Sequence, residues 1–132
     1  MFVHLKNRAL LRVSGSDAET FLQGQLSNDI KKLDSANVQM NAYCQHQGKI
    51  LALFWVLRFE GSFFLSFPLD LLEVIKARLQ MFVIMSDVVI EDITKEHIQV
   101  GSIDETYPKA FVINQKLSLI ITNKQDINQF NM

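Results

Sequence analysis

Eight consecutive apolar residues at positions 50–57 lie between two short turns and constrain the fold more than any other feature. The turns are Gly48-Lys49 before the run and Glu60-Gly61 after it. A strand that is apolar on both faces must be covered on both faces, so the run predicts a central strand of a sheet. The run is far shorter than the roughly 20 residues that a membrane-spanning helix needs.

A strand and a helix are predicted before this run. Residues 9–13 form a short apolar stretch that predicts a strand. Ser16 and Glu19 have the spacing of a capping box, in which two side chains bond the first free N–H groups of a helix. Apolar residues at helical spacing then predict a helix over residues 17–26.

Residues 38–46 alternate between apolar and polar side chains, which predicts a half-buried strand. The tight break that follows pairs this strand with the apolar run in a hairpin. The side of the alternation that we expect in the core carries Val38, Met40, Ala42 and Cys44.

The rest of the first 95 residues completes an α+β pattern. A third strand is predicted at residues 62–67, an amphipathic helix begins near Asp70, and a strand returns at residues 87–93. The order is strand, helix, three strands, helix, strand, which indicates a ferredoxin-like α+β sandwich with extra C-terminal strands. The residues expected in its core are Phe21, Leu22, Leu53, Phe54, Val56, Leu65, Ile75 and Leu79.

The C-terminal part is rich in short strand patterns and has no helix pattern of its own. We therefore divide the chain into an α+β domain at residues 1–95 and a short β-rich extension at residues 96–132. The polar tail at residues 123–132 is expected either to fray or to take part in a contact that the sequence does not identify. The predicted strands of the extension lie at residues 98–103, 110–114 and 117–122.

Composition limits the classes of protein that the chain can represent. A length of 132 residues favours one domain. The 13 Lys and Arg against 14 Asp and Glu give a net charge of −1, which argues against direct nucleic-acid binding. One cysteine excludes an internal disulfide, and no signal-peptide pattern begins the chain. We expect a soluble, cytoplasmic protein without a membrane segment.

Cysteine and histidine residues do not form a recognisable metal or nucleophile motif. Cys44 and His46 lie two residues apart, and no pair has the spacing of a zinc site with His4 or His97. We predict no metal site. Cys44 is interpreted as a buried, inert residue whose thiol pKa is raised by its surroundings.

Two segments carry a resemblance to a known family. Residues 8–18 and 21–29 include the run Phe-Leu-Gln-Gly-Gln-Leu-Ser-Asn-Asp, and residues 42–51 place a cysteine before Gly48-Lys49 and a long strand. These motifs resemble the YgfZ-like folate-binding proteins, which are relatives of the glycine-cleavage T-protein. The resemblance covers residues 5–92 and concerns the N-terminal part of that family.

The resemblance implies a fold, a ligand and a role. It implies the N-terminal α+β domain of these proteins, tetrahydrofolate or a related folate as ligand, and an accessory role in iron–sulfur cluster assembly or tRNA modification. Iron–sulfur assembly proteins are the implied partners. The polar residues that we place nearest the folate are Arg8, Gln23, Asn28 and Lys49.

Plainer interpretations of these residues remain open. Arg8 either stacks on a flat ring or pairs with a folate carboxylate, or it is an exposed residue before a strand. Gln23 and Asn28 either face a ligand cleft or shape the turn after the first helix.

Three departures from the family weaken an enzymatic role. The T-protein pattern Gly-Gly-x-x-Asp-Asp would place a carboxylate at Ala52 or Leu53. The C-terminal YgfZ signature Lys-Gly-Cys-x-x-Gly-Gln-Glu is absent, and the family's members are longer. We therefore predict a non-catalytic protein that binds folate weakly, because part of the cavity wall is missing.

Two alternatives remain: an interaction module that kept the fold and lost the ligand, and an aminomethyltransferase-related one-carbon enzyme. The chain is expected either to be a fragment or to be a naturally short relative. In both cases the surface that later subdomains cover would be open, so we expect a homo-oligomer, joined through strand edges at residues 110–122.

Overall fold

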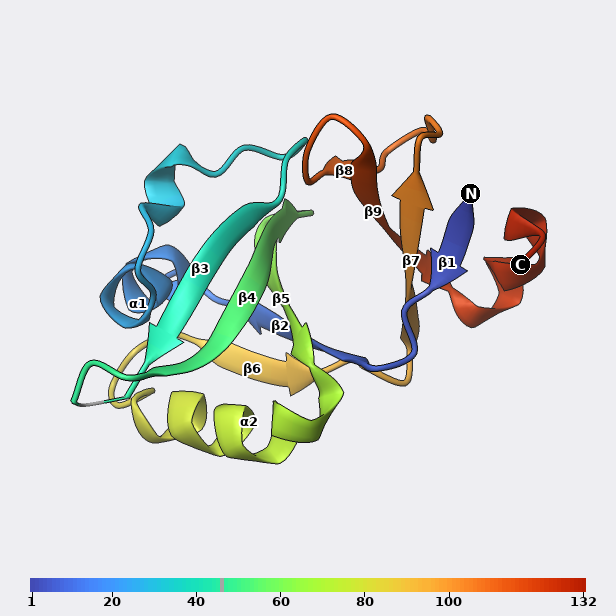
Figure 1. The fold of residues 1–132 in the computed structure, drawn as a ribbon. Helices are drawn as coiled ribbons and strands as arrows, with labels where there is room; N and C mark the ends of the chain where they lie inside the picture. The colour runs from blue at the N-terminus through green and yellow to red at the C-terminus, as the bar shows by residue number, and fades with distance from the viewer. Residues whose placement is uncertain (46) are drawn as a thin grey trace.

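The five-stranded sheet at the centre of the molecule is covered by two helices on one face. The computed structural model describes residues 1–45 and 47–132. The strand order is β3-β4-β5-β2-β6, and every neighbouring pair is antiparallel. Figure 1 shows α1 and α2 on the side of this sheet away from the second sheet. The elements are β2 (Arg8–Ser14), α1 (Ala18–Gln25), β3 (Gln39–Cys44), β4 (Ile50–Phe59), β5 (Ser62–Pro68), α2 (Leu72–Met81) and β6 (Val89–Asp92), with single 3-10 turns at η1 (Ile30–Lys32) and η2 (Leu69–Leu71).

A second, four-stranded antiparallel sheet packs against the other face. Its strand order is β1-β7-β9-β8, so the N-terminal strand joins the C-terminal strands. The division of the chain near residue 95 stays a prediction. The elements are β1 (Phe2–His4), β7 (His97–Ile103), β8 (Phe111–Val112), β9 (Leu117–Asn123) and the 3-10 helix η3 (Lys124–Phe130).

The predicted α+β class and element order are confirmed. Strand, helix, three strands, helix and strand appear as β2, α1, β3, β4, β5, α2 and β6. Of the two outcomes predicted for the tail, the structure shows a contact: η3 follows β9, and Phe130 is buried against the second sheet. None of the helices in the described residues is long and apolar enough to cross a membrane.

Three hydrophobic clusters follow the layers. The largest lies between the helices and the five-stranded sheet, where Phe54 stacks on Tyr43 with centroids 5.4 Å apart and contacts Phe67 at 5.1 Å. A second cluster joins the two sheets through Leu57, Phe64 and partners. The third lies beneath η3. Seven of the eight predicted core residues are buried, and Leu53 is the exception, at 53% exposed.

The predicted burial of β3 is inverted. Asn41 and Tyr43 are buried, whereas Met40 and Cys44 are exposed. The polar Asn41 can be buried because its Oδ1 accepts from the N–H of Asn28 at 2.8 Å and its Nδ2 donates to Gln39. Alternation in hydropathy therefore assigned the wrong face to this strand.

The predicted capping box at the start of α1 is also wrong. Asp87 Oδ2 accepts from the backbone N–H and the hydroxyl of Ser16, at 3.0 and 2.7 Å. Glu19 pairs instead with Arg58 at 2.8 Å. Gly15 permits this arrangement, because its φ is +110° and a Cβ there would lie 2.2 Å from the carbonyl oxygen of Asp87. A contact with the loop before β6 replaces the local cap.

Candidate functional site

The outer face of the five-stranded sheet is only partly covered. The second sheet covers Leu10, Leu57 and Phe64. Beyond its reach, Met40 and Leu53 are 50% and 53% exposed, and Met40 pairs with Trp55 across β3 and β4. Residues two apart on a strand share a face, so Leu53 and Trp55 lie on the same side of β4. We call Arg8, Met40, Leu53 and Trp55 the outer-face site.

Arg8 is held in a fixed position at the centre of this site. Its guanidinium lies 3.8 Å from the centroid of the Trp55 ring, which is a cation–π contact. Its Nε donates to Ser66 Oγ and its Nη2 donates to the Ser66 carbonyl oxygen, both at 2.8 Å. The side chain therefore crosses from β2 over β5 to β4.

A buried polar chain ties this arginine to the second sheet. The hydroxyl of Ser66, itself fully buried, donates to Gln99 Oε1. Gln99 Nε2 donates in turn to the carbonyl oxygens of Ala9 at 3.1 Å and Arg8 at 3.4 Å. Because Gln99 belongs to β7, the second sheet fixes the hydroxyl that orients Arg8.

Arg8 carries a charge that the protein leaves without an anionic partner. Desolvation by burial lowers the pKa of its guanidinium to about 10, so it is still protonated at neutral pH. Within residues 1–45 and 47–132, Arg8 makes no ion pair, and three of its five N–H groups have no acceptor. Burying an unpaired charge is costly, and a bound carboxylate or phosphate would offset that cost.

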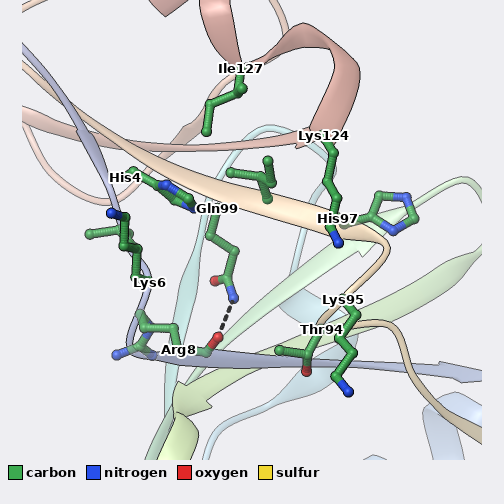
Figure 2. A pocket seen from close by; sticks show the side chains of 11 residues that line it. His4, Lys6, Arg8, Thr94, Lys95, His97, Gln99, Lys124 and Ile127 are labelled. Carbon is green, nitrogen blue, oxygen red and sulfur yellow. Dashed lines mark hydrogen bonds between the residues drawn. The ribbon is translucent and has the colours of Figure 1, made fainter. Parts of the chain in front are cut away.

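A pocket of about 450 Å³ lies next to Arg8, between β2 and the second sheet. Figure 2 shows His4, Lys6 and Arg8 on one side of the pocket, Lys95, His97 and Lys124 on the other, and Gln99 between them. No Asp or Glu is among its described lining residues. Desolvation and the nearby charge of Lys6 lower the pKa of the His4 imidazole. We call these residues the basic pocket.

Gln23 and Asn28, two of the predicted ligand residues, make hydrogen bonds within the protein. Gln23 Oε1 accepts from the N–H of Ile30 at 2.8 Å, which fixes the turn into η1. Asn28 Nδ2 donates to the Met40 carbonyl oxygen at 3.2 Å, and the Ser27 hydroxyl accepts from the N–H of Ala42. These residues cover the outer edge of β3, and their role in ligand binding stays a prediction.

Lys49 and Cys44 lie at the hairpin between β3 and β4. Lys49 is exposed, and its carbonyl oxygen accepts from the N–H of Gln45 at 2.7 Å. Cys44 is exposed, which contradicts the prediction of a buried thiol. His46 lies outside the described residues. Among the described residues, no three His, Cys, Asp or Glu side chains form a group that could hold a metal ion.

Sequence reasoning missed several residues of these two sites. Trp55 was assigned to an apolar strand, although it is the single tryptophan of the chain. Ser66 and Gln99 lie 33 residues apart and come together only through packing of the two sheets. Lys95 and Lys124 share a pocket for the same reason. Of these residues, only Ser66 gave a local signal in the sequence, because it is a polar residue within an otherwise apolar strand.

Comparison with known proteins gives partial sequence matches. No protein-family profile matches the chain. An uncharacterized protein of Haemophilus influenzae is 36% identical over 72 residues, 54% of this chain and 26% of that protein. The tRNA-modifying protein YgfZ of Vibrio atlanticus is 26% identical over 91 residues, 69% of this chain and 28% of that protein. An aminomethyltransferase of Exiguobacterium sibiricum is 34% identical over 111 residues, 83% of this chain and 30% of that protein.

The structural match covers almost the whole chain. The glycine cleavage system aminomethyltransferase T of Bartonella henselae superposes with a TM-score of 0.78 at 13% identity, over 98% of this chain and 44% of that one. This chain spans 26–30% of the length of the three curated relatives given above. The resemblance that the two sequence motifs predict is thereby confirmed: the chain has the fold of the aminomethyltransferases and is similar, over part of their length, to the YgfZ proteins.

Proposed function

We propose that the chain binds a folate-type ligand, such as tetrahydrofolate, on the outer-face site. The observation that carries this proposal is Arg8, a partly buried cation that stacks on Trp55, is held by Ser66, and has no carboxylate partner in the described residues. An arginine positioned in this way is suited to a planar anionic group.

The chemistry of a folate matches the two kinds of surface at this site. Its glutamate carboxylates can accept from the N–H groups of Arg8 that Ser66 does not use. Its flat conjugated ring can lie against the apolar surface of Met40, Leu53 and Trp55. The site is open on one side, so the ligand would keep much of its surface in water and bind weakly.

We further propose a non-catalytic, accessory role in iron–sulfur cluster assembly or tRNA modification. The positions that match the acidic pair of the T-protein pattern are Ala52, which is buried in the core, and Leu53, which lies on the outer face. Neither side chain can transfer a proton. The name of the YgfZ relatives, tRNA-modifying protein, supports a role in tRNA modification. With this role we propose a cytoplasmic location and iron–sulfur assembly proteins as partners.

Titration calorimetry with tetrahydrofolate tests folate binding. We expect a dissociation constant in about the high-micromolar to millimolar range. Arg8→Gln should abolish the measurable heat, whereas Arg12→Gln, on the same strand and over Phe64 instead of Trp55, should leave it unchanged. Equal loss in both variants, or no binding by the unaltered chain, would overturn the proposal.

An interaction module is the second candidate function. The observation that favours it is the exposed apolar end of α2 and the loop after it, where Met81, Phe82, Ile84 and Met85 are all exposed. Monomeric proteins seldom leave such side chains together in water. The strand edges first expected to join two copies are used within the chain: β9 lies between β7 and β8, and Asn37 pairs with Val112.

Light scattering separates this candidate from a monomeric folate-binding protein. If the α2 end joins two copies, the molar mass should be that of a dimer and should fall to that of a monomer in Phe82→Ser/Ile84→Ser. A monomer at high protein concentration would exclude self-association through this end.

A further inference from the structure

The basic pocket has more positive charge than the rest of the surface would predict. Four of the 13 Lys and Arg residues line it, although the whole chain has a net charge of −1. The lysines make no ion pair within the described residues, and no described Asp or Glu lines the pocket. Charges of one sign that share a pocket repel one another, and a bound anion relieves that repulsion.

The elements that carry these charges come from distant parts of the chain. Lys6 follows β1, Lys95 precedes β7, and Lys124 begins η3. Only the pairing of β1 with β7 and of β7 with β9 brings them to one place. Figure 2 shows Lys6 on one side of the pocket and Lys95 and Lys124 on the other.

The size of the pocket limits its ligand. A volume of about 450 Å³ is within the range of small-molecule sites, and Leu5, Ile98 and Ile127 supply its apolar lining. Because the three lysines are exposed, each contact with an anion is weak in water, so several charged groups on one ligand are needed to hold it. Arg58, Lys31 and Lys32 do not line the pocket, since Arg58 pairs with Glu19 and the two lysines lie in η1.

We propose that the basic pocket binds a small multivalent oxyanion, a ligand with two or more phosphate or carboxylate groups close together. Lys95 and Lys124 contact one end of the ligand and Lys6 the other. The three lysines are exposed, so their flexible side chains can fold onto the ligand without rearrangement of the sheets. This site borders the outer-face site: Arg8 lines the pocket, but its guanidinium lies over Trp55 on β4, on the outer-face side.

Calorimetry with tripolyphosphate and with citrate tests the proposal and separates phosphate from carboxylate as the source of charge. We expect one ligand molecule per chain for at least one of the two anions. Lys95→Gln/Lys124→Gln should weaken binding by about tenfold or more, because two charge-assisted contacts are lost. Lys31→Gln/Lys32→Gln removes the same charge from exposed positions in η1 and is the matched control, with affinity expected to change less than about twofold.

An NMR titration tests the proposal independently of calorimetry. The imidazole of His4 lies in the pocket beside Lys6, and a bound anion should raise its pKa, which is visible in an NMR titration. Equal weakening in both double variants would show bulk charge attraction and overturn the proposal. It would equally be overturned if neither anion bound, or if a transfer RNA bound through Lys95 and Lys124 while both small anions did not.

Discussion

The two faces of the five-stranded sheet differ in how completely their side chains are buried, although both faces are formed by the same strands. On the inner face, Phe54 and Ala52 pack into an apolar core beneath the helices. On the outer face, Leu53 and Trp55 from the same strand lie at the border of the second sheet, and Leu53 remains half exposed. The inner face holds the largest apolar cluster, whereas the outer face has exposed apolar side chains and a charge without an ion pair in the described residues.

The largest expected difference between the faces comes from adjacent positions of β4. Ala52→Asp places a carboxylate in the core with no partner and should destabilise the protein by about 4 kcal/mol or more. Leu53→Asp places it in water and should change stability by less than about 1 kcal/mol. Urea denaturation followed by circular dichroism measures both. Similar losses in the two variants would contradict the assignment of faces.

Truncation of the core aromatic stack gives the next effect. Phe54→Ala should cost about 3–5 kcal/mol, because the contacts with Tyr43 and Phe67 are lost and a cavity is left. Met40→Ala, on the outer face, should cost less than about 1 kcal/mol. The same denaturation experiment compares them, and a cost for Phe54→Ala no larger than that for Met40→Ala would show that the stack is not the core.

Gln99 links the outer face to the second sheet. Replacing it should cost less stability than Phe54→Ala. Gln99→Leu leaves the Ser66 hydroxyl without its acceptor and removes the hydrogen bond from Gln99 to the Ala9 carbonyl oxygen, at a cost of about 1–3 kcal/mol. Arg8 should also become less ordered on Trp55, which would shift the emission of this single tryptophan. An unchanged emission spectrum and unchanged stability would show that the polar chain does not position Arg8.

The smallest effect concerns acid pH at the end of the inner face. Hydrogen bonds from Ser16 lower the pKa of the Asp87 carboxyl below its ordinary value of 3.8. A carboxyl with a lowered folded pKa stabilises the protein above the unfolded pKa, and this contribution is lost as the pH falls through the folded pKa. Asp87→Asn should therefore lower the unfolding temperature at neutral pH and flatten its decline in acid. A decline as steep as that of the unaltered chain would contradict this role.

Sequence patterns predicted the inner face well and the outer face poorly, for a physical reason. Burial of Phe54, Val56 and Leu65 follows from local hydropathy, which a single strand displays. Exposure of Leu53 depends on how far the second sheet extends, and no local pattern encodes that distance. Asn41 was assigned to the wrong face because its partner, the N–H of Asn28, comes from a neighbouring turn.

The candidate sites show the same division. Arg8 was singled out by the family resemblance, but its stacking partner Trp55 and its anchor Ser66 are brought to it by strand pairing. Asn28 was singled out by the same resemblance, and its hydrogen bonds close the edge of β3. The sequence can thus identify the motif residues, whereas the residues that contact them can be identified only from the fold.

Fluorescence of Trp55 during titration with tetrahydrofolate reports on ligand binding at the outer face, because the chain has one tryptophan and it lies under Arg8. After correction for absorption with a free tryptophan derivative, we expect saturable quenching that Arg8→Gln abolishes and Arg12→Gln retains. Quenching that never saturates, or that is the same in both variants, would contradict a ligand site on the outer face.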